Sequence, residues 1–363
     1  MKLNLLIVED SEAVIAQWKE KLEFYSVGDA PKYEIEHKIV TKLSEAKALL
    51  DNTQFEAAVI DIRLDENGTQ TDHGNDVLAH LSESSLTVCA IHTGEPGTEI
   101  IKEHQKEFVQ VFKKGDGDGI DNVLLWLDKK VDMVSAIKSM QDSFSKSMAE
   151  AFTKSIWPRW SHWLSAEENP NLTVQALTRH MASHLHASFL NEVSSVHPEE
   201  HYFIPPLQDR LDTGDIFFIE GEHFILVTPR CDLAREKNPT FQLVNLKSVQ
   251  EEWLEHHELK SNEANSKKIK ESAQKSIEKL VNHGDRSPKL HFIPQVKLSS
   301  DEVFGPFHAQ FNFMDCIEAS DIARETLASQ RIATLSNEFV PSLVERLGAY
   351  FSRIGTPDYS HPE

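Results

Sequence analysis

The sequence predicts an α/β protein whose first third is a doubly wound, five-stranded parallel sheet with helices on both faces. Three observations lead to this fold class. Five short apolar runs alternate with stretches of helical periodicity in the first third of the chain. A long helical stretch without proline follows, and the remaining residues read as a mixture of strands and helices. We therefore expect a domain at 1–128, a connecting helix at 129–156 and an α+β domain at 157–363.

The individual elements follow in chain order. The strand-like runs cover residues 3–8, 33–40, 56–61, 86–91 and 108–112, and the helix-like stretches between them cover 11–25, 42–52, 74–83 and 97–106. Ligands of such sheets bind beyond the carboxyl ends of the strands. The residues that follow each strand are therefore the first candidates for function.

Charged and polar side chains gather at these strand ends. The sequence places five there: Glu9, Asp10, Asp61, Thr93 and Lys113. Neighbouring acids repel one another, and three carboxylates in a small space favour a hard divalent cation with oxygen ligands, for which Mg²⁺ fits best. A carboxylate can also attack a phosphoryl group and form an aspartyl phosphate, whose oxygens a metal, a hydroxyl and an ammonium group would neutralise. The pattern thus predicts a Mg²⁺ site formed by Glu9, Asp10 and Asp61.

These residues resemble the receiver domain of two-component response regulators, the CheY-like fold, over residues 1–128. The segments that carry the resemblance are IVEDSEAV, AAVIDIRL, HGNDVL, AIHTG and VFKKG. The resemblance implies that a sensor histidine kinase phosphorylates Asp61 and that Thr93 and Lys113 read the phosphorylated state. The alternative is that the acids are ordinary solvated loop residues, which would explain any one position better than all five in order.

The chain departs from the family pattern in three places. The link from the acceptor to the third helix, residues 62–73, is longer and more polar than usual. Lys114 follows Lys113 where the family usually has proline, so both lysines are candidates and Lys113 is preferred. Gln110 stands where an aromatic residue is common. We therefore expect ordinary phosphorylation but a different route of signal transmission.

The connecting helix has an apolar seam. Residues 119–156 contain no proline, and the seam steps by four and three through Met133, Ile137, Met140, Phe144, Ser147 and Ala151. Such a heptad-like pattern predicts a homodimer through 129–156. The alternative is that the helix packs on its own C-terminal domain.

The last two hundred residues match no family clearly. A helix at about 172–194 carries His180 and His184, whose spacing of four can bind a metal but is more often found in surface or core histidines. Two strands joined by a turn at Gly221 precede Cys231 and Asp232, a segment loosely similar to PemK-like toxins that cleave RNA. The alternative function is therefore a ribonuclease, controlled by the receiver, that uses Cys231, Asp232 and a histidine. The simpler interpretation of Cys231 is a buried structural cysteine without a catalytic role.

Composition limits the partners. The net charge of −21 argues against a nucleic-acid-binding surface over the whole chain, so DNA is an unexpected partner, and also against an anionic membrane surface. Three widely spaced cysteines, no apolar run long enough to cross a membrane and no leader-like start predict a cytoplasmic protein. We expect a response regulator that signals through protein contacts, or a phosphate sink that competes with another regulator, similar to accessory receiver proteins of phage-defence operons.

Overall fold

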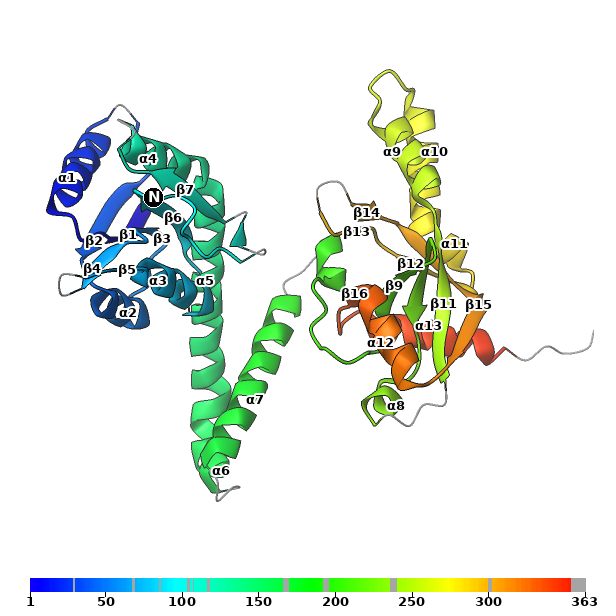
Figure 1. The fold of residues 1–363 in the computed structure, drawn as a ribbon. Helices are drawn as coiled ribbons and strands as arrows, with labels where there is room; N and C mark the ends of the chain where they lie inside the picture. Colours follow the sequence, from blue (N-terminus) through cyan, green and yellow to red (C-terminus); the bar gives the residue numbers. More distant parts are fainter. Residues whose placement is uncertain are drawn as a thin grey trace, which may run out of the picture. The chain divides into compact units, whose positions relative to one another are not determined.

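The computed structural model divides the chain into two units, Met1–Glu192 and Val193–Glu363 (Figure 1). It describes every residue except 29, 67–68, 85, 103–104, 107, 116–117, 166–169, 192–195, 236–239, 300–301 and 354–363. The first unit extends past residue 157, where the sequence predicted a boundary, and includes the helices that follow it. Within the described ranges, every helix is too short or too polar to span a bilayer.

A five-stranded sheet in the order β2-β1-β3-β6-β7 forms the base of the first unit. Its strands are β1 (Lys2–Val8), β2 (Glu34–Val40), β3 (Ala57–Ile60), β6 (Val88–Thr93) and β7 (Val109–Lys113). All four pairings are parallel. Every residue of β3 and β6 is buried, as expected for central strands covered on both faces. The predicted α/β fold is therefore confirmed, and its strand order is the flavodoxin-like doubly wound order.

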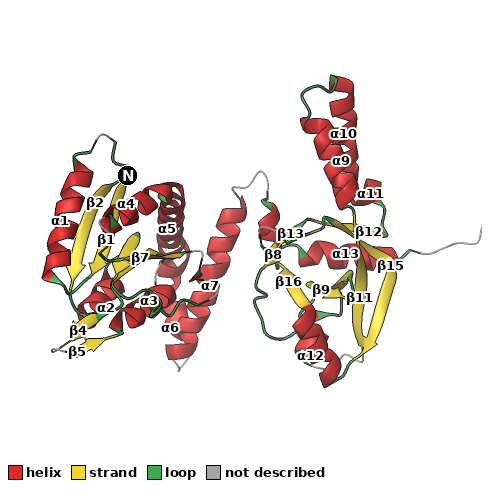
Figure 2. Ribbon diagram, turned by 45° about the horizontal axis from the view of Figure 1, so that its top comes forward, coloured by secondary structure: helices red, strands yellow, loops and turns green. Residues whose placement is uncertain are grey.

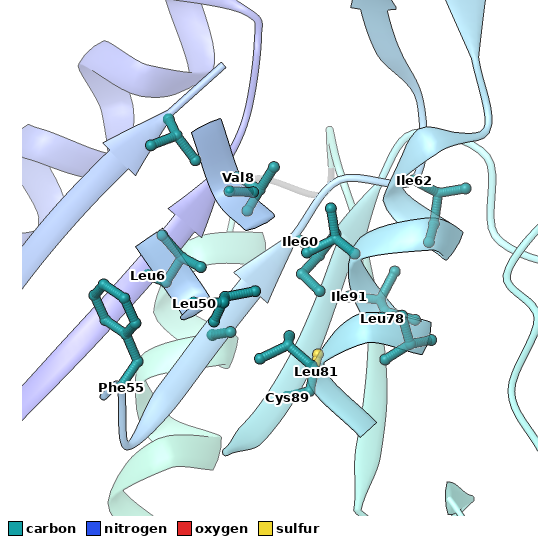
Figure 3. Packing of buried hydrophobic residues seen from close by; sticks show 14 of the residues in the cluster. Leu6, Val8, Leu50, Phe55, Ile60, Ile62, Leu78, Leu81, Cys89 and Ile91 are labelled. Atoms are coloured by element: carbon teal, nitrogen blue, oxygen red, sulfur yellow. The ribbon is translucent and has the colours of Figure 1, made fainter. Parts of the chain in front are cut away.

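Helices cover both faces of this sheet (Figure 2). They are α1 (Glu12–Ser26) and α4 (Gly119–Lys129) on one face, and α2 (Leu43–Asn52) and α3 (His73–Ser84) on the other. Each face has its own apolar core, one containing Trp18 from α1 and Leu124 from α4. The other contains Leu50 from α2 and Leu78 from α3, packed against the strands (Figure 3). The strands thus have apolar side chains on both faces, and packing on both faces fixes the position of their carboxyl ends.

Two connections differ from expectation. The helix predicted at 97–106 is wrong for the described residues there, because 97–102 form turns and irregular chain. Gly97 has a φ of 100°, a left-handed conformation that does not occur inside an α-helix. The polar link at 62–73 instead contains a small antiparallel hairpin of β4 (Leu64–Glu66) and β5 (Thr69–Thr71).

The single helix predicted across 119–156 is interrupted at Lys130. The segments after α4 are α5 (Val131–Ala151), a π-helical turn (Phe152–Ile156), a 3-10 turn (Trp157–Arg159), α6 (Trp160–Ser165) and α7 (Pro170–Asn191). The predicted seam is used within the chain. Met133 and Ile137 pack against the core of the first unit, and the Phe144 ring lies 5.0 Å from the Phe189 ring of α7. The helix thus packs on the core of the first unit and on α7, and only α7 belongs to the segment 157–363 that the sequence assigned to the C-terminal domain. The homodimer stays a prediction.

The second unit is an α+β domain built on a seven-stranded antiparallel sheet in the order β12-β15-β11-β10-β9-β16-β8. Its strands are β8 (Tyr202–Phe203), β9 (Asp215–Ile219), β10 (Glu222–Leu226), β11 (Thr240–Ser248), β12 (Leu290–Ile293), β15 (Phe307–Glu318) and β16 (Arg331–Leu335), with a separate pair β13 (Val296–Lys297) and β14 (Val303–Phe304). Its helices are α8 (Arg230–Ala234), α9 (Gln250–Ser261), α10 (Lys267–Val281), α11 (His283–Arg286), α12 (Asp321–Gln330) and α13 (Val340–Phe351), with a 3-10 turn at Pro198–His201.

The hairpin that the sequence predicts around Gly221 is confirmed. The turn between β9 and β10 is made by Glu220 and Gly221, whose φ angles of 50° and 89° suit a tight hairpin. The charged stretch after residue 248 forms α9 and α10, which pack against each other, and α9 has no buried residue.

Candidate functional site

Three carboxylates meet at the carboxyl edge of the parallel sheet. The Glu9 N–H follows β1 and donates to the Val40 carbonyl at 3.0 Å, and the Asp61 N–H follows β3 and donates to the Val8 carbonyl at 2.9 Å. These ladder bonds fix where the two side chains leave the sheet. Glu9 and Asp61 are 1% and 5% exposed, and one oxygen from each of Glu9, Asp10 and Asp61 lies within 4.8 Å of the others. The structure thus brings together the three predicted metal ligands.

A lysine contacts two of the carboxylates, and a buried threonine ends the neighbouring strand. The Lys114 ammonium lies 2.6 Å from a Glu9 oxygen and 2.6 Å from an Asp61 oxygen. Thr93, the last residue of β6, is fully buried, and its Oγ1 accepts a 3.4 Å hydrogen bond from the Glu95 N–H. The Lys114 N–H donates to the Thr93 carbonyl at 2.8 Å, so the turn after β7 is hydrogen-bonded to the end of β6.

The lysine at the carboxylates is Lys114, whereas the sequence favoured Lys113. Lys113 is exposed at the end of β7. Lys114 is the first residue of the turn that follows β7. The family register pointed to Lys113, but the turn brings the side chain of Lys114 between Glu9 and Asp61.

Gly74 lets α3 begin directly over the acceptor segment. A Cβ at this position would lie 2.1 Å from the Asp61 carbonyl oxygen and 2.5 Å from the Ile62 Cα. The Gly74 N–H donates to the Ile62 carbonyl at 3.1 Å. A backbone approach this close requires glycine, which explains why the HGNDVL segment carries one.

The charges suit a divalent cation. Burial raises the pKa of the Glu9 carboxyl to about 7, although the Lys114 ammonium and the Ser11 N–H act in the opposite direction. One ammonium cannot neutralise three carboxylates, and carboxylate oxygens are the ligands that Mg²⁺ prefers. The residues present therefore fit Mg²⁺, with Glu9, Asp10 and Asp61 as the ligands from the protein.

Sequence reasoning missed two residues beside the acceptor. The Arg63 N–H donates to an Asp61 oxygen at 3.3 Å, and its guanidinium contacts Glu95 through Nη2 at 3.0 Å. Arg63 comes two positions after Asp61, and Glu95 comes two positions after Thr93. Nothing in the local sequence pairs them, because they belong to loops after different strands.

Comparisons with known proteins add little to this geometry. The sequence matches no protein-family model and no curated protein. Solved structures similar to this chain include a CheY-like response regulator receiver domain protein from Methanospirillum hungatei (19% identity, 38% of this chain, 98% of that chain, TM-score 0.27). Another is a CheY-like response regulator receiver domain from Methylobacillus flagellatus (21% identity, 34% of this chain, 98% of that chain, TM-score 0.27). A third is the receiver domain of response regulator 1452 from Francisella (19% identity, 36% of this chain, 95% of that chain, TM-score 0.27). At these identities and TM-scores, the site must be argued from its own geometry.

The candidate ribonuclease residues Cys231 and Asp232 contact each other on α8. Cys231 is exposed on α8, so the simple buried cysteine is wrong, and its thiol donates to Asp232 at 3.6 Å. The His201 ring stacks on Phe339 at 3.7 Å, and the His223 ring lies among the rings of phenylalanines on neighbouring strands. These two histidines are thus engaged in packing, and the structure gives the ribonuclease alternative no further support.

Proposed function

We propose that the chain is a response-regulator protein whose first unit accepts a phosphoryl group on Asp61 from a histidine kinase. The observation that carries the proposal is the meeting of three carboxylates within 4.8 Å at the carboxyl edge of a parallel sheet, with an ammonium 2.6 Å from two of them. Solvated loop acids would have no reason to be buried around one lysine.

The chemistry follows from the positions of these groups. An Asp61 carboxylate oxygen attacks the phosphorus atom of a phosphohistidine, the P–N bond breaks, and the imidazole leaves with its electron pair. In this proposal the Lys114 ammonium and the Thr93 hydroxyl neutralise the oxygens of the resulting acyl phosphate. A Mg²⁺ ion held by Glu9, Asp10 and Asp61 would supply further neutralisation of charge.

Transmission must differ from a receiver with a switching aromatic residue. Gln110 lies on β7 where such a residue is common, and residues 97–102 are not helical. We therefore propose output through protein contacts, or phosphate storage in competition with another regulator. A role in phage defence stays a prediction from the sequence resemblance, and no geometric feature described above bears on it.

The test is intact mass over time with Mg²⁺ and a small phosphodonor or a candidate kinase. We expect the wild type to gain one phosphoryl group and Asp61→Asn to gain none. Asp76→Asn is the matched control, because Asp76 is exposed on α3 and should leave phosphorylation unchanged. A wild type that gains no phosphoryl group from any donor, or an Asp61→Asn variant that gains one, would refute the proposal.

A further inference from the structure

The C-terminal part of α5 and the π-helical turn after it repeat with a period of four residues. Each group of four holds a large apolar residue, a small or amide residue, a charged residue and a small residue: MQDS, FSKS, MAEA and FTKS. Residues four apart lie on one ridge of a helix. The large apolar residues therefore form one ridge, which we call the apolar ridge: Met140, Phe144, Met148 and Phe152.

The structure leaves the apolar ridge open to solvent. Each of its four residues is between 39% and 44% exposed, whereas α5 residues up to Ile137 pack on the core of the first unit. The neighbouring helix α7 lies along one flank of the ridge (Figure 1). On that flank Ser147 and Ala151 line a groove of about 310 Å³ between α5 and α7. The apolar ridge is thus a different surface from the seam that the sequence indicated, which runs through Ser147 and Ala151.

We propose that a second copy of this chain binds the apolar ridge, so that two α5 helices pack in antiparallel directions about a twofold axis. A row of exposed large apolar side chains marks an interaction site. The order Met, Phe, Met, Phe favours an identical partner, because its reverse places a methionine opposite each phenylalanine. Met140 then faces Phe152 of the second copy, and Phe144 faces Met148 of the second copy. Contacts of a thioether with an aromatic ring are favourable.

The residues beside the ridge suit such a contact. Ser145 and Ala149 follow the ridge on the flank away from α7, and side chains this small form a shallow groove. Ridges of residues four apart interlock with such grooves when two helices cross at about 50°. The charged residues lie on the other side of α5, where the second copy leaves them in water: Asp142, Lys146, Glu150 and Lys154.

The exposed area accounts for a large part of a stable interface. A large apolar side chain has roughly 200 Å² of surface, so four residues that are about two-fifths exposed leave roughly 300–350 Å² per chain. Two copies cover roughly 650 Å² through their ridges alone, and a specific interface needs about 1,000 Å². Trp157 extends the surface at one end, because it is 61% exposed and its ring lies 5.9 Å from that of Phe152.

Sedimentation of the unphosphorylated full chain over a dilution series tests the proposal. We expect a dimer that dissociates on dilution, and association at least about a hundredfold weaker for Met148→Glu, because a twofold interface carries each substitution twice. Ser139→Glu is the matched control, since it adds the same charge at an exposed position on the opposite side of α5. Circular dichroism checks that each variant is folded, and Met140→Glu is the second ridge variant should Met148→Glu not fold.

Disulfide formation tests the antiparallel direction. Cys231 and Cys316 are exposed, so both are first replaced by serine. Chains that carry Met140→Cys are then mixed with chains that carry Phe152→Cys and oxidised with glutathione disulfide. We expect disulfides between the two kinds of chain, whereas parallel helices would link chains of the same kind.

The outcomes concern this surface and not the acceptor site. A wild type that is monomeric at about 100 µM, or a dimer that folded Met148→Glu and Met140→Glu both leave unchanged, overturns the proposal. Disulfides only between chains of the same kind overturn the antiparallel arrangement. None of these measurements requires phosphorylation, so the role of Asp61 is tested separately.

Discussion

Replacing Lys114 by methionine should make the stability of the first unit depend strongly on pH and on Mg²⁺. The side chain keeps most of its length but loses the ammonium that lies 2.6 Å from both Glu9 and Asp61. Two buried carboxylates would then face each other with no lysine between them. Their charge can be relieved in two ways, by a proton on Glu9 or by a bound cation.

The magnitude can be worked from the site. With both groups ionised and at most 4.8 Å apart, their repulsion reaches at least about 3.5 kcal/mol at an effective dielectric constant of ~20. Glu9 already has a raised pKa of about 7 with Lys114 present, and loss of the ammonium raises it further. A proton on Glu9 therefore relieves most of the repulsion below pH 7.

The sign follows from proton binding. An acid whose pKa is raised on folding loses stability as pH rises, until the pKa in the folded protein is passed. In the wild type, the contribution of Glu9 to the free energy of unfolding stops falling above about pH 7. In the variant, this contribution continues to fall by about 1.4 kcal/mol per pH unit. At pH 8.5 the difference should be about 2 kcal/mol.

Urea denaturation in EDTA at pH 6 and pH 8.5 measures this difference, with Lys113→Met as the matched control. Mg²⁺ should stabilise Lys114→Met more than the wild type, because the lysine and the ion compete for the same oxygens. A destabilisation that is equal at both pH values and indifferent to Mg²⁺, or one that Lys113→Met reproduces, would refute the reasoning.

Three further predictions concern other positions. Gly74→Ala should destabilise the first unit by about 1–3 kcal/mol in denaturant titrations and abolish phosphorylation, since its Cβ would lie 2.1 Å from the Asp61 carbonyl oxygen. Arg331→Met should cost about 3–5 kcal/mol because it leaves the buried Asp215 without its 3.2 Å ion pair, and an added Asp215→Asn should restore part of the loss. Burial lowers the pKa of His291 to about 3, so this residue should contribute about 2 kcal/mol to the loss of stability of the second unit between pH 7 and pH 5, and calorimetry should show that His291→Gln reduces the loss by about that amount.

The strands and the acidic site could be predicted because both depend on local pattern. Strands buried on both faces are continuous apolar runs, and LLIV in β1 and VCAI in β6 stand out against the polar helices. Residues that follow parallel strands necessarily meet at one edge of the sheet. Glu9 and Asp61 could therefore be placed together although more than fifty residues separate them.

The choice of lysine and the partner of α5 could not be predicted, for two different reasons. Moving the end of β7 by a single residue exchanges Lys113 and Lys114, and the sequence does not determine that register. An apolar seam predicts that a helix packs against an apolar surface, but it does not identify the segment that provides that surface. The partner that Phe144 contacts in α7 follows only after two helical turns and a further short helix. The ion pair of Arg63 with Glu95 joins side chains of separate loops, for which the sequence offers no signal.

The most direct test of the central claim identifies the residue that carries the phosphoryl group. Borohydride reduces an aspartyl phosphate to homoserine, which peptide mass spectrometry can locate after incubation with Mg²⁺ and a phosphodonor. The account predicts homoserine at position 61, dependent on Mg²⁺ and absent when Asp61 is replaced by asparagine. Homoserine at another aspartate, or a phosphoryl group on a histidine with position 61 unmodified, would contradict it.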